Sequence, residues 1–327
     1  MMQKGERLRN ALAGADVDRL PVAIWRHWPG DDQRPADFAR CLVGFQRAYD
    51  WDFINVTPFS AYMTADYGVH TMWQADMTGD RAIIKRALTR SIEWTELRTL
   101  DAGRGVLAKT LEAVHLVDDA LGTADDPPPI IVSIPSPLTQ AGQIAGHDLL
   151  LRHIRTAPDR VRTGLSTITD SVLRFMAELR RESIAGIHYT MDYASFDRLS
   201  ADEYRAFGEP FDRQILSAMP DKWWLNILQL PATAPMFDLA VTYALPVIQY
   251  DMTLDDLSRA RVTFDGVLCG GTTASQLNME SPTAFRDTAR RIALDMNRRR
   301  MILSASAPVM VCTPRANLRA VREIVEE

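Results

Sequence analysis

One stretch of the sequence gathers several side chains that can transfer protons or hold a ligand. Residues 186–193, GIHYTMDY, begin with small and apolar residues, and His188, Tyr189, Asp192 and Tyr193 crowd the far end. Imidazole and carboxyl groups act as acids or bases when burial shifts their pKa toward neutrality. The pattern indicates a buried strand whose last residues carry the chemistry.

The segment that follows supports this interpretation. Ser200 and Glu203 fit the S-x-x-E capping box that starts a helix, so a loop and a helix come after the strand. Barrels of alternating strands and helices build their sites at the carboxyl ends of such strands. The alternative is structural: His188 and Tyr189 are core residues, and Asp192 caps a loop.

The elements that must position these residues form a regular series. Most of the apolar segments are separated by a helical pattern, and they are apolar throughout, which is typical of strands covered on both faces. We therefore predict a single α/β domain over residues 1–327, a (β/α)₈ TIM barrel. A doubly wound open sheet would need a glycine-rich phosphate loop, which the sequence lacks. Eight strands are expected, at residues 20–26, 53–58, 130–135, 186–192, 223–230, 246–251, 266–271 and 301–307.

The carboxyl ends of these strands supply the candidate site residues. A guanidinium binds a carboxylate through two parallel hydrogen bonds, so Arg26 is the expected carboxylate ligand. Each candidate also has a structural alternative, as an ion pair or a core residue. The candidates for catalysis are Arg26, His27, His188, Asp192 and Asp251. The candidates for substrate binding are Tyr62, Tyr189, Tyr193, Asn226, Gln229 and Tyr250.

Metal and nucleophile motifs are not evident. The three cysteines, Cys41, Cys269 and Cys312, form no C-x-x-C pair, which favours a reducing compartment without disulfides. Zinc sites need three or four convergent ligands, and neither H-E-x-x-H nor H-x-C occurs. We expect no metal and no cofactor, with a site of His188, Asp192 and another carboxylate as the weak alternative. The G-x-S-x-G motif of serine hydrolases is also missing.

Composition limits the partners. The chain is 46% hydrophobic and 24% charged, as in ordinary globular proteins, and its net charge of -5 argues against nucleic acid or an acidic membrane as partner. No apolar run reaches the roughly 18 residues of a membrane span. The first residues do not resemble a signal peptide. We expect a cytoplasmic protein that binds a small molecule.

Four stretches, in this order and spacing, resemble the uroporphyrinogen decarboxylase superfamily. They are LRNALAGADVDRLPVAIWRHWPG, YDWDFINVTPFSAYMTADYGV, DYASFDRLSADEYRAFGEPFDRQIL and MILSASAPVMVCTPRANLRAVREIVEE. The resemblance implies a (β/α)₈ barrel, a homodimer and one of two chemistries. One branch decarboxylates pyrrole acetate groups without metal or cofactor. The other transfers methyl groups to or from corrinoids, thiols or folates, with zinc holding a thiolate.

The decarboxylase's own site is not reproduced. Arg26 matches the first arginine of its substrate loop, but the second arginine falls at Gly30. Its site tyrosine falls at Ala141, and its late histidine falls at Ala307. The aspartate that grips the pyrrole nitrogens falls near Asp52 or Phe53. The resemblance therefore predicts a substrate other than uroporphyrinogen.

The methyltransferase pattern is missing as well. Its zinc ligands would stand at Asn226, Leu228 and Ala307, or at Gln229 in a shifted alignment, and none of these is a soft ligand.

The sequence predicts a metal-independent decarboxylase, a carbon–carbon lyase acting on a small, aromatic or heteroaromatic carboxylic acid. Arg26 would hold the carboxylate, and an acid among His27, His188 and Asp192 would protonate the carbon that loses CO₂. Asp251 and Tyr250 would orient the substrate. Two alternatives stay open. One is a methyltransferase with a metal site rebuilt from His188, Asp192 and Asp251, and the other is a non-catalytic ligand-binding barrel.

Overall fold

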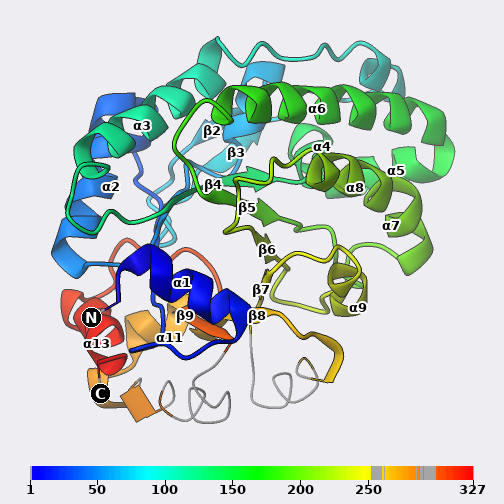
Figure 1. The fold of residues 1–327 in the computed structure, drawn as a ribbon. Helices are drawn as coiled ribbons and strands as arrows, with labels where there is room; N and C mark the ends of the chain where they lie inside the picture. Colours follow the sequence, from blue (N-terminus) through cyan, green and yellow to red (C-terminus); the bar gives the residue numbers. More distant parts are fainter. Residues whose placement is uncertain are drawn as a thin grey trace.

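The computed structural model describes residues 2–251, 260, 262–284, 286–287, 290 and 300–326. In this part of the chain, seven strands form one curled sheet (Figure 1), and each pairs in parallel with the next along the chain. This order, without any reversal, is that of a barrel. The strands are β1 (Ile54–Val56), β4 (Ile130–Pro135), β5 (Gly186–Thr190), β6 (Ile227–Gln229), β7 (Val247–Gln249), β8 (Val267–Thr272) and β9 (Met301–Ala305).

Residues 21–26 occupy the eighth position of the barrel, between the first and the last strand. The Ala23 amide donates to the Leu303 carbonyl at 3.1 Å, and the Asp52 amide donates to the Val22 carbonyl at 2.8 Å. The segment makes isolated bridges rather than a continuous ladder, so it is not a regular strand as predicted. With it the predicted (β/α)₈ fold is confirmed.

Strand β6 is shorter than the strand predicted at 223–230, because a side chain replaces part of the ladder. The Asn226 Oδ1 atom accepts from the Ile187 amide at 3.0 Å, and its Nδ2 atom donates to the Trp223 carbonyl at 2.6 Å. Asn226 therefore precedes β6 and lies at the amino end of the barrel. The sequence placed it at the carboxyl end, among the site residues, and this placement is wrong.

Helices cover the outer face of the sheet (Figure 1). The long helix α6 shows why: its buried residues recur at three- and four-residue spacing, which gives one apolar stripe toward the strands. The predicted helix at 254–261 falls almost wholly outside the described residues, and that at 281–297 in large part. The helices are α1 (Lys4–Ala13), α2 (Pro35–Tyr49), α3 (Gly105–Leu121), α4 (Pro137–Ala145), α5 (His147–Thr156), α6 (Pro158–Leu179), α7 (Ala201–Phe207), α8 (Glu209–Ser217), α9 (Phe237–Val241), α11 (Ala274–Met279) and α13 (Arg315–Ile324).

The predicted capping box is confirmed at the start of α7. The Glu203 amide donates to Ser200 Oγ at 3.2 Å, and the Ser200 amide donates to Glu203 Oε2 at 3.0 Å. Two backbone donors at the helix start are satisfied in this way.

A buried ion-pair cluster fixes the amino end of the barrel. Asp52 is fully buried, and its carboxylate lies 2.6 Å from Arg7 Nη1 and 2.7 Å from Arg19 Nη1. It also accepts from the Val22 amide at 2.7 Å. Asp52 thus joins α1 to the closing segment, and it is not available to grip a ligand at the opposite end.

A two-stranded hairpin crosses the carboxyl end. It consists of β2 (His70–Met72) and β3 (Ala82–Lys85), and its connection packs beside His27. Gly79, with φ +77°, leaves no room for a side chain: a Cβ there would lie 2.5 Å from Val311 and 3.3 Å from His27. The turn therefore closes tightly over this edge of the barrel. Among the described residues, no helix is long and apolar enough to cross a membrane.

Candidate active site

A cavity of about 130 Å³ lies at the carboxyl ends of β1, β4, β5 and β6. Its apolar walls include Trp25, Phe59 and three prolines. For scale, a dry cavity of about 150 Å³ in another protein holds benzene. The space therefore suits a single small ring. Five of the predicted site residues line it: His27, Tyr62, His188, Asp192 and Gln229.

Asp192 brings a carboxyl group without a hydrogen-bond donor into this cavity. Within the described residues its carboxyl oxygens accept no hydrogen bond, whereas its backbone amide donates to Thr139 Oγ1 at 3.0 Å. Burial raises the pKa of Asp192; Arg198 opposes this rise and Asp80 adds to it. An acid whose pKa is raised keeps its proton at higher pH, so Asp192 can serve as a proton donor.

His27 lines the same cavity with a defined tautomer. Its Nδ1 atom lies 3.1 Å from the Pro58 carbonyl oxygen, which can only accept, so Nδ1 carries the proton. In the neutral ring Nε2 then carries a lone pair, and no hydrogen bond occupies it within the described part of the chain. This nitrogen can take up and return a proton.

His188 forms part of the cavity floor. Its Nδ1 atom lies 3.1 Å from Ser133 Oγ, and its Nε2 atom lies 2.6 Å from Gln249 Oε1. Burial lowers the pKa of His188 to about 4. Both ring nitrogens are therefore engaged and the ring is neutral, which suits a fixed wall better than a proton carrier.

Tyr62 and Gln229 complete the predicted residues at this cavity. The Tyr62 hydroxyl donates to the Ser133 carbonyl at 2.7 Å, and burial raises its pKa. Gln229 Nε2 donates weakly to the Ser306 carbonyl at 3.4 Å, so its amide remains adaptable.

Arg26 points elsewhere. It does not line the cavity; its guanidinium lies 4.5 Å from the centre of the Trp28 ring, and its Nη1 atom donates to the Val311 carbonyl at 3.1 Å. The two neighbouring residues His27 and Trp25 face the cavity instead. Because side chains alternate along extended backbone, all three cannot face inward.

Tyr189 also points away from the cavity. Its hydroxyl donates to Asp212 Oδ1 at 2.7 Å, and Tyr204 and Tyr243 donate to Oδ2 at 2.7 and 3.0 Å. Burial raises the pKa of Asp212 to about 6, against the three hydroxyls that lower it. We call Tyr189, Tyr204, Asp212 and Tyr243 the tyrosine–aspartate cluster; it connects β5 to the helix layer.

Tyr193 stands beside the site without lining it. Its ring lies 5.0 Å from the Arg198 guanidinium and 5.8 Å from the His147 ring. It also fills the space over Gly142, where a Cβ would come within 2.3 Å. This contact explains a glycine in the middle of α4.

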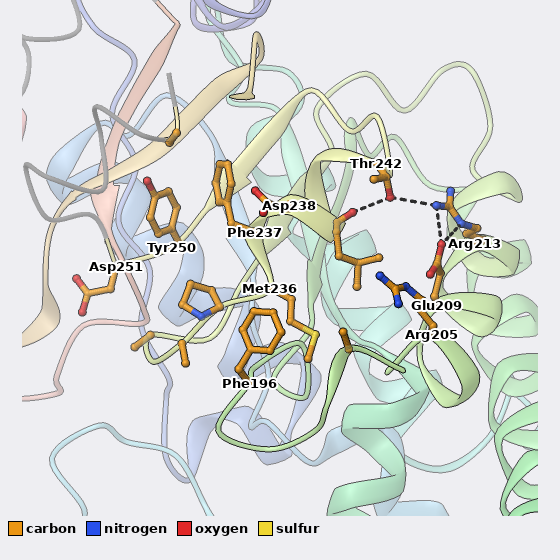
Figure 2. A pocket seen from close by; sticks show the side chains of 16 residues that line it. Phe196, Arg205, Glu209, Arg213, Met236, Phe237, Asp238, Thr242, Tyr250 and Asp251 are labelled. Carbon is orange, nitrogen blue, oxygen red and sulfur yellow. Dashed lines mark hydrogen bonds and ion pairs between the residues drawn. The ribbon is translucent and has the colours of Figure 1, made fainter. Parts of the chain in front are cut away.

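Tyr250 and Asp251 belong to a second, larger pocket of about 630 Å³ between α7, α8 and α9. Figure 2 shows them at one end of this pocket, with Arg205, Glu209 and Arg213 at the other. The sequence predicted both as the last residues of a strand at 246–251, whereas β7 ends at Gln249 and both residues follow it. Their side chains face a different space from those that follow β5. The proposed metal set of His188, Asp192 and Asp251 is therefore divided between two pockets.

Ser133 and Gln249 were not among the predicted site residues. Ser133 is the polar residue inside the apolar strand IIVSIP, and that break in the pattern is the signal that could have found it. Within the described residues, no three or more His, Cys, Asp or Glu side chains are grouped so that they could hold a metal. The zinc site of the methyltransferase branch does not fit these residues, since Asn226 lies at the wrong end of the barrel.

Residues 43–327 match the family described as uroporphyrinogen decarboxylase (URO-D). The chain belongs to the uroporphyrinogen decarboxylase family. Members of this superfamily are usually enzymes, either decarboxylases or methyltransferases. No curated protein matches the chain in sequence.

Two solved structures share the fold of this family member. A methyltransferase from Methanosarcina mazei superposes with a TM-score of 0.84 at 15% identity, covering 100% of this chain and 99% of that one. A putative vitamin-B12 independent methionine synthase from Listeria monocytogenes gives a TM-score of 0.51 at 7% identity, covering 89% of this chain and 85% of that one. At these identities the likeness establishes the barrel alone.

Proposed function

We propose that this member of the uroporphyrinogen decarboxylase family is a carbon–carbon lyase that removes CO₂ from a small, aromatic or heteroaromatic carboxylic acid. The observation that carries the proposal is Asp192, a carboxyl group with a raised pKa and no hydrogen-bond partner in the described structure, in a cavity that fits one ring. Uroporphyrinogen, with four pyrrole rings, is far larger than this space.

The reaction needs a proton on the carbon that loses the carboxylate. Protonated Asp192 transfers its proton to that ring carbon. The bond between this carbon and the carboxylate then breaks, its electron pair returns to the ring, and CO₂ leaves. The Asp192 carboxylate regains a proton from solvent through Nε2 of His27, so one proton is consumed in each turnover.

The walls of the cavity favour loss of the charged group. Pro58, Phe59 and Pro135 offer no hydrogen bonds from their side chains to a carboxylate. A carboxylate placed there loses hydration, whereas neutral CO₂ loses little. Arg26 has no part in this step, because its guanidinium lies outside the cavity.

Turnover in D₂O tests the proposal directly. A panel of single-ring acids is incubated with the protein, and NMR detects deuterium at the carbon that has lost CO₂. We expect one or more acids to react with wild type and not with Asp192→Asn. Asp197→Asn, an exposed aspartate of the same loop, is the matched control and should react like wild type.

Methyl transfer is the second candidate, supported by the name of the Methanosarcina mazei structure. It predicts a bound metal, and elemental analysis of tag-free protein measures this. About one zinc per chain would favour methyl transfer over the proposed lyase. Tight binding of an acid without CO₂ release or deuterium uptake would instead favour a ligand-binding barrel.

A further inference from the structure

A chain of hydrogen bonds crosses the floor of the cavity from Thr57 to β9. Thr57 Oγ1 lies 2.9 Å from Ser133 Oγ, which lies 3.1 Å from His188 Nδ1. His188 Nε2 lies 2.6 Å from Gln249 Oε1, and Gln249 Nε2 lies 2.7 Å from the Ala305 carbonyl oxygen. All five residues are buried.

The end of this series of hydrogen bonds at Ala305 determines which atom is the donor in each bond. The Ala305 carbonyl can only accept, so the Gln249 amide nitrogen faces it and the Gln249 oxygen faces His188. That oxygen also only accepts, so His188 Nε2 carries the ring proton. Burial keeps the ring neutral. His188 Nδ1 therefore has a lone pair, and the Ser133 hydroxyl must donate to it.

Ser133 has one hydroxyl proton, and the hydrogen bond to His188 Nδ1 uses it. Every other close contact of Ser133 Oγ must then donate to it. The structure has Asn55 Oδ1 3.0 Å from Ser133 Oγ, and an oxygen cannot donate, so the Asn55 amide must be turned by half a rotation. Only the orientation with Asn55 Nδ2 toward Ser133 satisfies this. It also gives Nδ2 a partner, whereas the reverse orientation leaves Nδ2 buried without one.

Thr57 is the first member of the chain and lines the cavity. Its acceptors are Ser133 Oγ at 2.9 Å and, more weakly, the Asn55 carbonyl at 3.5 Å. Both direct the Thr57 proton away from the ligand space. Turning the proton toward a ligand would break a buried hydrogen bond without replacing it.

We infer that Thr57 offers the ligand an acceptor, so that the site selects small aromatic acids bearing an N–H or O–H donor on the ring. This inference rests on the proposed function for the carboxylate of the ligand and adds a second recognised group. An acid of the same shape without the donor would leave the Thr57 oxygen facing a lone pair.

Two isosteric acids measure this preference. Pyrrole-2-carboxylate carries a ring N–H where furan-2-carboxylate carries an oxygen. By calorimetry we expect wild type to bind the pyrrole acid about tenfold more tightly, the effect of one hydrogen bond. Thr57→Val should abolish the preference, and Thr57→Ser should retain it.

The outcomes separate the two proposals. Equal affinity for the two acids in wild type, or a preference for furan, would overturn the donor inference and leave the proposed function intact. Absence of binding by both acids would overturn the proposed substrate class, and the inference would then be decided without ligand.

The measurement that needs no ligand is the tautomer of the His188 ring. The protein has six histidines, and ¹⁵N-labelled wild type compared with His188→Gln identifies the His188 ring signals by NMR. Near neutral pH we expect a neutral ring with its proton on Nε2. A charged ring, or a proton on Nδ1, would reverse the direction of the chain and overturn the inference.

Discussion

Asp192 and Asp212 are two carboxyl groups whose pKa values burial raises, yet their surroundings differ completely. Asp212 accepts hydrogen bonds from three tyrosine hydroxyls and adjoins no solvent. Asp192 faces a cavity, and its carboxyl group accepts no hydrogen bond in the described structure. A perturbed pKa therefore does not identify a catalytic group. Unused hydrogen-bonding capacity beside an open space distinguishes Asp192 from the structural carboxyl.

The largest expected effect separates the two groups by activity. Asp192→Asn should lower kcat/KM on the order of 10²- to 10⁴-fold, the usual contribution of a general acid. Its free energy of unfolding should stay the same or rise, because the variant lacks a carboxyl group whose charged form its surroundings disfavour. Steady-state rates and urea unfolding measure both, with Asp197→Asn as control. An active Asp192→Asn would remove the contrast.

Asp212→Leu should have the opposite profile. Removing the carboxylate leaves three buried hydroxyls without an acceptor, and each unsatisfied group costs about 1–3 kcal/mol. We expect a loss on the order of 3–5 kcal/mol in urea unfolding. Asp221→Asn, at an exposed position, should change little. A fully stable Asp212→Leu would mean that the tyrosine–aspartate cluster is dispensable.

The pH dependence of stability sharpens the comparison further. The pKa of Asp212 is about 6 in the folded chain and 3.8 as an unperturbed side chain, so the folded state binds the proton more tightly between these values. Asp212 therefore favours folding as pH falls from about 6 to 4, by about 3 kcal/mol, and this contribution is lost as pH rises again. The free energy of unfolding of wild type and of Asp212→Asn is measured at several pH values in this range, and its slope against pH should differ between the two. Parallel curves would contradict it.

The smallest expected effect concerns one member of the tyrosine–aspartate cluster. Tyr243 makes the longest of the three hydrogen bonds, at 3.0 Å, and lies nearest the surface. Tyr243→Phe should cost about 1 kcal/mol. Tyr204→Phe, which removes a bond of 2.7 Å from a fully buried residue, should cost more. Equal losses in urea unfolding would show that bond length does not rank these contacts.

The repeating pattern of apolar segments and helices was enough to predict the barrel. It was also enough to place His27, His188 and Asp192 at one cavity, because parallel strands bring their carboxyl ends together. The direction of each side chain was not predictable in the same way. Arg26 and Tyr189 lie at the expected places in the chain and face away from the cavity.

Two physical reasons account for those misses. Along residues 21–26 and along β5, side chains alternate between the barrel interior and the helix layer. A strand that is apolar on both faces does not reveal which of its side chains face the interior. Asn226 misled for another reason, since its side chain replaces backbone hydrogen bonds before β6 begins. Propensity and periodicity describe the strand and contain no information on such a replacement.

The seam of the barrel, where residues 21–26 meet β9, has a consequence for how the protein is made. Ser304 Oγ donates to the Ala23 carbonyl across 281 residues of sequence, and both chain ends lie on this side of the barrel (Figure 1). A ribosome must therefore release the chain through β9 before the seam can form, and contacts of such long range form slowly. His27 follows directly on this seam. The nascent protein thus acquires the complete cavity only after β9 has emerged, so shorter nascent chains lack the space in which a ligand would bind.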